Sequence, residues 1–527
     1  MEQRVQIESA KKIFLGLVVL FGLYALPNHA ATSADNAKAF ANTPPLVRID
    51  SGMLEGVKKK SSFSFKGIPY AAAPIGQGRW REPVSATPWL GVRPADRIGN
   101  ACMQNLSLSA TSALNPGRIS EDCLFLNVWT PTLRPVAKLP VMVWIHGGAL
   151  VSGSGGVAGY DGEALAQRGV VLVSINYRLG AFGFFSHPAF NAERSSNIKN
   201  FGLMDQIAAL QWVQKNISAF GGDANNVTIF GQSAGAESVL ALYSSPLARG
   251  LFQKGIAQSP YGIPSHTAEK ARTVSIAVAS AVGLDGLRAS AAQLRAAPAN
   301  KFVNLKSPEL TLAPGFIIGD RALPVSILDT FQAKKEAALP LIIGSNSDEA
   351  SVAAEMGVEP AKIIEGLGKS KILVKALYPK VSNSEDLGRQ VMRDALFTAF
   401  ARRISYLHSQ RAPTWRYYFS YVQERLRGSQ TGVPHSGEII YMMDTANVCA
   451  CLTAPFTNTD SLMSQKLADS WVAFARQASP QTKQLPSWPK DSVSNDTLME
   501  FAPNNAVRKK FMQPRVNALI LGLKAAD

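Results

Sequence analysis

Short apolar runs alternate with helical patterns along the chain from about residue 141 onward. Four runs are rich in Val, Ile, Leu and aromatic residues, and most of them end near a glycine: residues 141–145, 170–177, 227–230 and 339–343. Between them, residues 204–217 and 234–243 place apolar side chains at helical spacing. Continuous apolar strands with intervening helices predict a mainly parallel sheet that is covered by helices on both faces. The fold class expected is therefore α/β.

The first 31 residues have the pattern of an export signal. Lys11 and Lys12 precede an apolar stretch, residues 13–26, that ends at Pro27 and is followed by small residues. The stretch is shorter than the ~18 residues of a membrane-spanning helix. We expect a signal peptide over 1–31, a flexible leader over 32–45 and a single domain over 46–527. The alternative is an uncleaved anchor. Cleavage implies a periplasmic or secreted protein without a stable membrane span.

The composition is that of a large globular protein with an unusual charge balance. Of 527 residues, 46% are hydrophobic and 17% are charged, which argues against a disordered chain or a coiled coil. Lys and Arg number 54 against 38 Asp and Glu, a formal net charge of +16. A basic balance suggests an anionic partner, such as a nucleic acid, a membrane surface, a cell wall or an acidic substrate. Export and the chemistry below argue against nucleic acid.

One serine lies between a predicted strand and a predicted helix, in Gly231-Gln232-Ser233-Ala234-Gly235. The pattern G-x-S-x-G in this setting is typical of a nucleophile elbow, a strained turn that exposes the serine hydroxyl above the sheet. The helix N-terminus behind the serine favours developing negative charge. We therefore predict that Ser233 is a nucleophile. A serine with a purely structural place in a turn is the alternative.

Longer segments resemble the type B carboxylesterase family, which contains carboxylesterases, cholinesterases and neuroligin-like adhesion proteins. Residues 220–235 match its serine signature, and residues 121–131 match its second signature. Further similar segments are residues 67–71, 176–180 and 200–206. The resemblance runs from about residue 45 to the C-terminus. It implies the α/β-hydrolase fold and a serine carboxylic ester hydrolase that forms an acyl-enzyme on a small-molecule ester, with no metal and no cofactor. A neuroligin-like binding protein would lack the serine or the histidine.

A serine nucleophile needs a general base, and the chain has six histidines that are candidates for it. In α/β-hydrolases the chain order is serine, acid, histidine. His435 fits that order and resembles the family's catalytic histidine, so we expect it to take the Ser233 proton and return it to the leaving alcohol. His408 lies in an arginine-rich helical stretch, where a solvated surface histidine is expected.

The acid is expected between Ser233 and His435, after the strand at 339–343. Glu349 matches the family's pattern, although Ala350 stands where the family usually has Gly. Asp348 is the alternative, and a solvated loop acid is a third reading. The acid would hold the tautomer of the histidine and stabilise its imidazolium form.

Donors for the oxyanion are expected in the glycine turn after the strand at 141–145. By resemblance they are the backbone N–H groups of Gly148, Ala149 and Ala234. Ala149 stands where many relatives have Gly, which a backbone donor tolerates.

The four cysteines form two sets. By resemblance, Cys102 and Cys123 close a disulfide, whose loop would add about 3 kcal/mol by the chain-entropy estimate. Export makes oxidation plausible. Cys449 and Cys451 are separated by one residue. We favour a local disulfide for them, with free thiols as the alternative, because two cysteines without histidines nearby are too few for a zinc site.

The charged residues of the chain bear on the class of ester that it hydrolyses. Cholinesterases have a Trp where this chain has Leu114 and a Glu where it has Gln232, so both cation-attracting features are missing. Residues 401–430 hold six arginines and one acidic residue. They form either a solvated basic face or a surface for an anionic ester, with Arg402 and Arg403 as candidate contacts. We expect the substrates to be esters with polycarboxylate acyl groups, of the tricarballylate type that fumonisin esterases hydrolyse. General short-chain neutral esters are the alternative.

Overall fold

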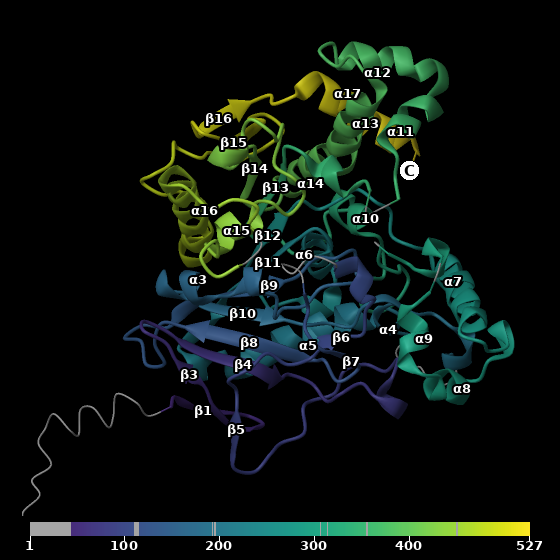
Figure 1. Ribbon diagram of the computed structural model, residues 1–527, viewed down its shortest axis with the longest axis vertical. Coiled ribbons are helices and arrows are strands. Elements are labelled where there is room, and N and C mark those ends of the chain that lie inside the picture. The colour runs from purple at the N-terminus through teal and green to yellow at the C-terminus, as the bar shows by residue number, and fades with distance from the viewer. Residues whose placement is uncertain are drawn as a thin grey trace, which may run out of the picture. The chain divides into compact units, whose positions relative to one another are not determined.

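The central feature of the molecule is one large sheet of eleven strands (Figure 1). The computed structural model describes residues 44–526 except 110–114, 192, 194–196, 306, 314, 355–356 and 450–451. The strands of the sheet are β3 (Val57–Lys58), β4 (Phe63–Pro69), β8 (Phe125–Thr130), β9 (Leu139–Ile145), β10 (Val171–Ile175), β11 (Gly222–Gln232), β12 (Lys254–Gln258), β13 (Leu341–Asn346), β14 (Thr414–Phe419), β15 (Thr497–Phe501) and β16 (Ala506–Lys509). The predicted signal peptide and nearly all of the predicted leader lie outside the described residues.

The sheet is parallel in its centre and antiparallel at its edges. Its strand order is β16-β15-β14-β13-β12-β11-β9-β10-β8-β4-β3. Every pair from β15 to β10 is parallel, whereas β16, β8, β4 and β3 pair antiparallel with their neighbours. Because parallel strands share one direction, the C-terminal ends of β9, β11, β12 and β13 lie at one edge, where ligands bind in open α/β sheets.

Helices cover both faces of the sheet. The α-helices are α3 (Glu163–Gln167), α4 (Gly180–Gly183), α5 (Phe201–Asn216), α6 (Ala234–Ser244), α7 (Ala268–Ala281), α8 (Ala291–Ala296), α9 (Ala299–Val303), α10 (Ile327–Gln332), α11 (Pro360–Gly366), α12 (Lys371–Leu377), α13 (Ser384–Met392), α14 (Ala399–His408), α15 (Ile439–Met443), α16 (Asn458–Gln477) and α17 (Gln513–Ala526). A π-helix, η12 (Arg393–Thr398), joins α13 to α14. Two further small sheets consist of β1 (Leu46–Ile49), β2 (Gly52–Glu55) and β5 (Val92–Pro94), and of β6 (Ala101–Cys102) and β7 (Ile119–Ser120).

The core lies on both sides of the sheet because consecutive strand residues point to opposite faces. In β9, Val141, Val143 and Ile145 belong to one apolar cluster, which also contains the buried apolar residues of α5 and α6. Met142 and Trp144 belong to a second cluster, which includes residues of α3, α15 and α16. This explains why the central strands read as continuous apolar runs, and it confirms the predicted α/β class.

The disulfide between Cys102 and Cys123, implied by the resemblance, is present. Cys449 is buried and disulfide-bonded, which agrees with the favoured local disulfide and excludes a free thiol at this position, whereas Cys451 lies outside the described residues. Leu114 also lies outside the described residues. In the part of the chain that the structure covers, no helix is long and apolar enough to cross a membrane.

Candidate active site

Ser233 occupies a strained turn between β11 and α6. Its backbone has φ 57° and ψ −125°, a conformation that residues other than glycine rarely adopt. A Cβ atom on Gly235 would collide with the carbonyl group of Ile145 in β9, so the helix can pack this closely on the sheet only with glycine. The turn leaves the Ser233 side chain facing a cavity rather than the core.

The turn after β9 brings Ala149, one of the predicted oxyanion donors, to the same cavity. Gly148, Ala149 and Leu150 all have positive φ, at 103°, 52° and 62°. A Cβ on Gly148 would collide with the carbonyl group of Ser152, which explains the glycine there. Among the described residues, the N–H groups of Gly148 and Ala149 have no backbone acceptor. The N–H of Ala234 is the first of its helix and has no acceptor within the helix.

His435 and Glu349 are in direct contact. The Nδ1 atom of His435 lies 2.5 Å from Oε2 of Glu349, and the glutamate is completely buried. Two more bonds fix the pair: the backbone N–H of Asn346 donates to Oε1 of Glu349 at 2.6 Å, and that of His435 donates to Oγ of Ser351 at 2.7 Å. The carboxylate of Glu349 therefore accepts a hydrogen bond from the N–H at Nδ1 of His435. This tautomer leaves Nε2 as the basic atom of a neutral imidazole.

Asp348, the alternative acid, points elsewhere. Its carboxylate accepts two hydrogen bonds from Arg389, at 2.7 and 2.8 Å. Burial raises the pKa of Asp348, and the guanidinium of Arg389 opposes that rise. The structure thus brings Glu349, and not Asp348, to the predicted histidine.

Gln232 contacts the histidine and is almost fully buried. Its side-chain nitrogen lies 3.1 Å from Nε2 of His435, on the side of the ring away from Glu349. An amide N–H that donates to Nε2 requires that atom to be unprotonated. The position at which cholinesterases have a Glu, a candidate contact for substrate, therefore touches the candidate base itself.

Ser233, Ala149 and His435 line one cavity of about 420 Å³. Its other walls are largely apolar and come from distant parts of the chain, including Phe302, Leu310 and Phe397. Among the described residues that line it, there is no Asp, Glu, Lys or Arg. The cavity therefore suits an uncharged, apolar part of a small molecule next to the serine.

Sequence reasoning missed the residues that shape this cavity. Phe397, in the π-helix η12, places its ring centroid 5.2 Å from that of His435, and its neighbour Leu396 also faces the cavity. Phe302 reaches the cavity from α9. A π-helix leaves no recognisable sequence signal, and no local pattern links these residues to Ser233.

The arginines of residues 401–430 do not together form an exposed basic face. Arg402 and Arg403 are buried on α14, and neither lines the cavity. Arg402 pairs with Asp496 at 2.5 Å, and Arg416 pairs with the same carboxylate at 2.6 Å. The expectation of a basic face is wrong for these buried arginines, because the acidic partners of Arg402 and Arg416 come from residues 491–496, far along the chain. Arg411, Arg425 and Arg427 are exposed, as a basic face requires.

The expected surface position of His408 is also wrong. Its side chain is fully buried, and its Nδ1 lies 3.0 Å from the buried carboxylate of Glu336. Its Nε2 lies 2.7 Å from the carbonyl oxygen of Leu339. Both ring nitrogens are thus engaged, and His408 does not line the cavity with Ser233, which is consistent with a structural histidine.

Replacing Arg402 with Gln should destabilise the fold without changing substrate preference. The change leaves the buried Asp496 with one fewer partner, and breaking a buried ion pair costs about 3 kcal/mol. Denaturant unfolding should show this loss, while the exposed control Arg425→Gln should change the free energy of unfolding by less than ~0.5 kcal/mol. A shift in the activity ratio between anionic and neutral esters in Arg402→Gln would restore this arginine as a substrate contact.

The described residues contain no group of three or more His, Cys, Asp or Glu side chains arranged to hold a metal ion. The chemistry available at the site is that of a serine, a carboxylate-paired histidine and backbone N–H groups.

A family model described as the carboxylesterase family matches residues 43–389 and 369–519 of the chain. Fumonisin B1 esterase of Sphingopyxis macrogoltabida is 33% identical over 496 residues, which cover 89% of this chain and 87% of that protein. Para-nitrobenzyl esterase of Bacillus subtilis is 34% identical over 465 residues, covering 85% and 92%.

Solved structures agree with these matches. A thermophilic PNB esterase superimposes with a TM-score of 0.78 at 30% identity, and the match covers 90% of this chain and 100% of that one. The carboxylesterase of Geobacillus stearothermophilus also gives a TM-score of 0.78, at 27% identity, covering 90% and 99%.

Proposed function

The chain belongs to the carboxylesterase family and is a carboxylic ester hydrolase with the α/β-hydrolase fold, and from this premise we propose that it works through an acyl-enzyme on Ser233. The observation that carries the proposal is the 2.5 Å contact between Glu349 and His435, with His435 and Ser233 lining the same cavity. This is the arrangement that nucleophilic catalysis by a serine requires.

In the first half-reaction, Nε2 of His435 takes the proton of Ser233 as its oxygen attacks the ester carbonyl carbon. The N–H groups of Gly148, Ala149 and Ala234 stabilise the oxyanion of the tetrahedral intermediate. The intermediate collapses when the imidazolium gives its proton to the leaving alcohol oxygen, so the C–O bond breaks and the acyl-enzyme remains. Glu349 stabilises the imidazolium throughout without accepting its proton.

In the second half-reaction, water takes the place of the alcohol. His435 removes a proton from the water, whose oxygen attacks the acyl carbon, and the same three N–H groups hold the oxyanion. Collapse returns the proton to Ser233 and releases the carboxylic acid. Gln232 can donate to Nε2 only while the ring is neutral, so this contact belongs to the resting enzyme.

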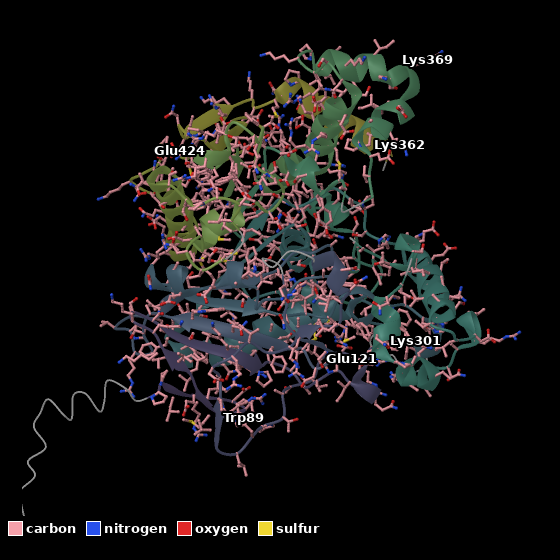
Figure 2. All side chains as sticks on the ribbon, viewed as in Figure 1. Trp89, Glu121, Lys301, Lys362, Lys369 and Glu424 are labelled. Carbon is pink, nitrogen blue, oxygen red and sulfur yellow. A yellow bond between two sulfur atoms is a disulfide. The ribbon has the colours of Figure 1, made fainter. Side chains whose placement is uncertain are left out.

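The apolar walls of the cavity support an ester whose uncharged portion lies beside Ser233. The described lining residues offer no cation to an acyl carboxylate, so neutral esters are the substrate class best supported by the geometry. Lys362, on α11, and Lys369, just after it, project from the outer surface of the molecule (Figure 2) and do not line this cavity.

A preference for polycarboxylate acyl groups is the second candidate. It is supported by the formal net charge of +16 and by the 33% identity to a protein named fumonisin B1 esterase. With no cation among the described lining residues, attraction of such a substrate would act mainly at long range, through the surface charge.

The two candidates differ in how salt affects the rate. We expect kcat/KM for an anionic ester to fall several-fold between 0.1 M and 1 M salt if long-range attraction operates, because the Debye length shortens from ~10 to ~3 Å. The neutral ester of the same alcohol should change by less than about twofold. Stopped-flow hydrolysis of a p-nitrophenyl ester pair measures both. Equal salt responses, with the neutral ester the better substrate, would remove the polycarboxylate candidate.

We also propose that the protein is exported, with residues 1–31 removed. The N-terminal pattern and the disulfide between Cys102 and Cys123 support this, since disulfides persist in oxidising compartments. N-terminal sequencing of protein from the periplasm and the culture medium tests the cleavage and distinguishes the periplasmic from the secreted location.

A further inference from the structure

A series of buried hydrogen bonds outside the cavity links the three proposed catalytic residues, Ser233, Glu349 and His435. The backbone N–H of Ser233 donates to the carbonyl oxygen of Gln258 at 2.9 Å. The side-chain amide of Gln258 donates to Oε1 of Glu438 at 3.0 Å, and that of Asn346 donates to Oε2 at 2.5 Å. The backbone N–H of Asn346 then reaches Glu349, which contacts His435.

The amide of Gln258 has a fixed orientation. The indole N–H of Trp471 donates to Oε1 of Gln258 at 3.1 Å, and an indole can only donate. The nitrogen of Gln258 must therefore face Glu438.

The amide of Asn346 is fixed in the same way. Its nitrogen lies 3.0 Å from the carbonyl oxygen of Pro434, which can only accept. Its own oxygen is buried without a partner in the described chain. Leaving a buried oxygen unpaired is unfavourable, so the residue is suited to this place by its two N–H donors and not by its carbonyl.

These three side chains, Gln258, Glu438 and Asn346, are fully buried, and none of them lines the cavity with Ser233. Burial raises the pKa of Glu438, and the nearby Glu349 raises it further, while the two amides oppose the rise. A buried carboxyl group of this kind is stable only while the amides of both Gln258 and Asn346 donate hydrogen bonds to it.

We propose that Asn346 is a positioning residue, which ties the loop of Glu349 to the loop of His435 through Glu438 and Pro434. The inference rests on the proposed function. Other bonds also join the two loops: the Asp348 N–H donates to the carbonyl oxygen of Val433, and the Val433 N–H donates to Oγ of Ser347. Asn346 differs from these because it alone, among the described residues, bonds both Glu349 and Glu438.

Asn346→Asp tests the proposal by keeping the shape and exchanging the donor for an acceptor. The new carboxyl group faces the oxygens of Glu438 and Pro434, and even when it shares a proton with Glu438 it has a single O–H and cannot donate to both. One of the two bonds is lost, so the two loops separate. A displacement of about 1 Å in a site of this kind costs on the order of 100-fold in rate. We expect kcat to fall by about 100-fold with KM within about twofold, because Asn346 lies outside the cavity.

The pH profile separates positioning from loss of folded protein. A histidine that loses contact with its carboxylate holds its proton less tightly, so the acidic limb of kcat/KM should move to lower pH in Asn346→Asp. A variant that is only less folded gives lower activity with an unchanged profile. Asn216→Asp is the matched control, since Asn216 is buried and hydrogen-bonded at the end of α5.

A second change restores the polarity. In Asn346→Asp combined with Glu438→Gln, the new amide offers its oxygen to Gln258 and its nitrogen to the new aspartate. We expect kcat about tenfold above that of Asn346→Asp alone. If Asn346→Asp does not fold, Asn346→Ser should show the same selective loss of kcat to a smaller extent, because one hydroxyl replaces two N–H donors.

The proposal is overturned if Asn346→Asp keeps kcat within about threefold of the wild type, or if the double variant recovers nothing. Ser233→Ala run in parallel identifies which claim fails. An active Ser233→Ala refutes the proposed function, whereas an inactive Ser233→Ala beside a fully active Asn346→Asp refutes only the role of Asn346.

Discussion

Ser233→Ala should lower kcat for p-nitrophenyl acetate by at least about 10⁴-fold and leave the fold intact. The change removes the only atom that the proposed mechanism makes covalent with substrate, and the cavity and backbone donors remain for binding. Alanine keeps a Cβ at the strained turn, so the elbow geometry needs no rearrangement. Steady-state hydrolysis and thermal unfolding of the same sample measure both effects.

Ser152→Ala is a suitable control for this variant. Its hydroxyl lies on the same turn as the proposed oxyanion donors Gly148 and Ala149, and among the described residues its one hydrogen bond goes to the carbonyl oxygen of Gly148, at 3.3 Å. We expect its activity to stay within about tenfold of the wild type. Turnover by Ser233→Ala at a rate near that of the control would refute the assignment of the nucleophile.

Glu349→Gln should lower kcat by roughly 10³- to 10⁴-fold, whereas Asp348→Asn should cost less than about tenfold. The neutral amide that replaces the carboxylate in Glu349→Gln cannot stabilise the imidazolium, and it favours the wrong tautomer of His435. Asp348 is committed to Arg389, so its loss removes a structural ion pair without touching the histidine. Single-turnover acylation rates compare the two variants directly. A larger loss in Asp348→Asn would transfer the proposed role to that residue.

Much of the fold could be predicted from the sequence because its signals are local. The run at 141–145 falls within β9, and the helix expected over 234–243 is α6. The elbow was recognisable because its two glycines and its serine lie within five consecutive residues. Glu349 and His435 needed the family resemblance, since they lie 86 residues apart and only the fold brings them into contact.

The wrong expectations concern burial and pairing between distant segments. An arginine-rich stretch predicts an exposed face only while its acidic partners are unknown, and those of Arg402 and Arg416 lie in residues 491–496. His408 was misplaced for the same reason, because Glu336 supplies its buried partner from another segment. The apolar cavity could not be predicted from the sequence either, since its walls come from α4, α9, η12 and loops that share no periodic pattern.

The acyl-enzyme itself is the most direct test of the mechanism. Enzyme mixed with p-nitrophenyl acetate and quenched in acid within milliseconds should carry one acetyl group, and peptide mass spectrometry should locate it on Ser233. The adduct should be absent from Ser233→Ala and should disappear as substrate is exhausted. Turnover with no acylated peptide, or an acetyl group on any other residue at stoichiometric yield, would contradict the account.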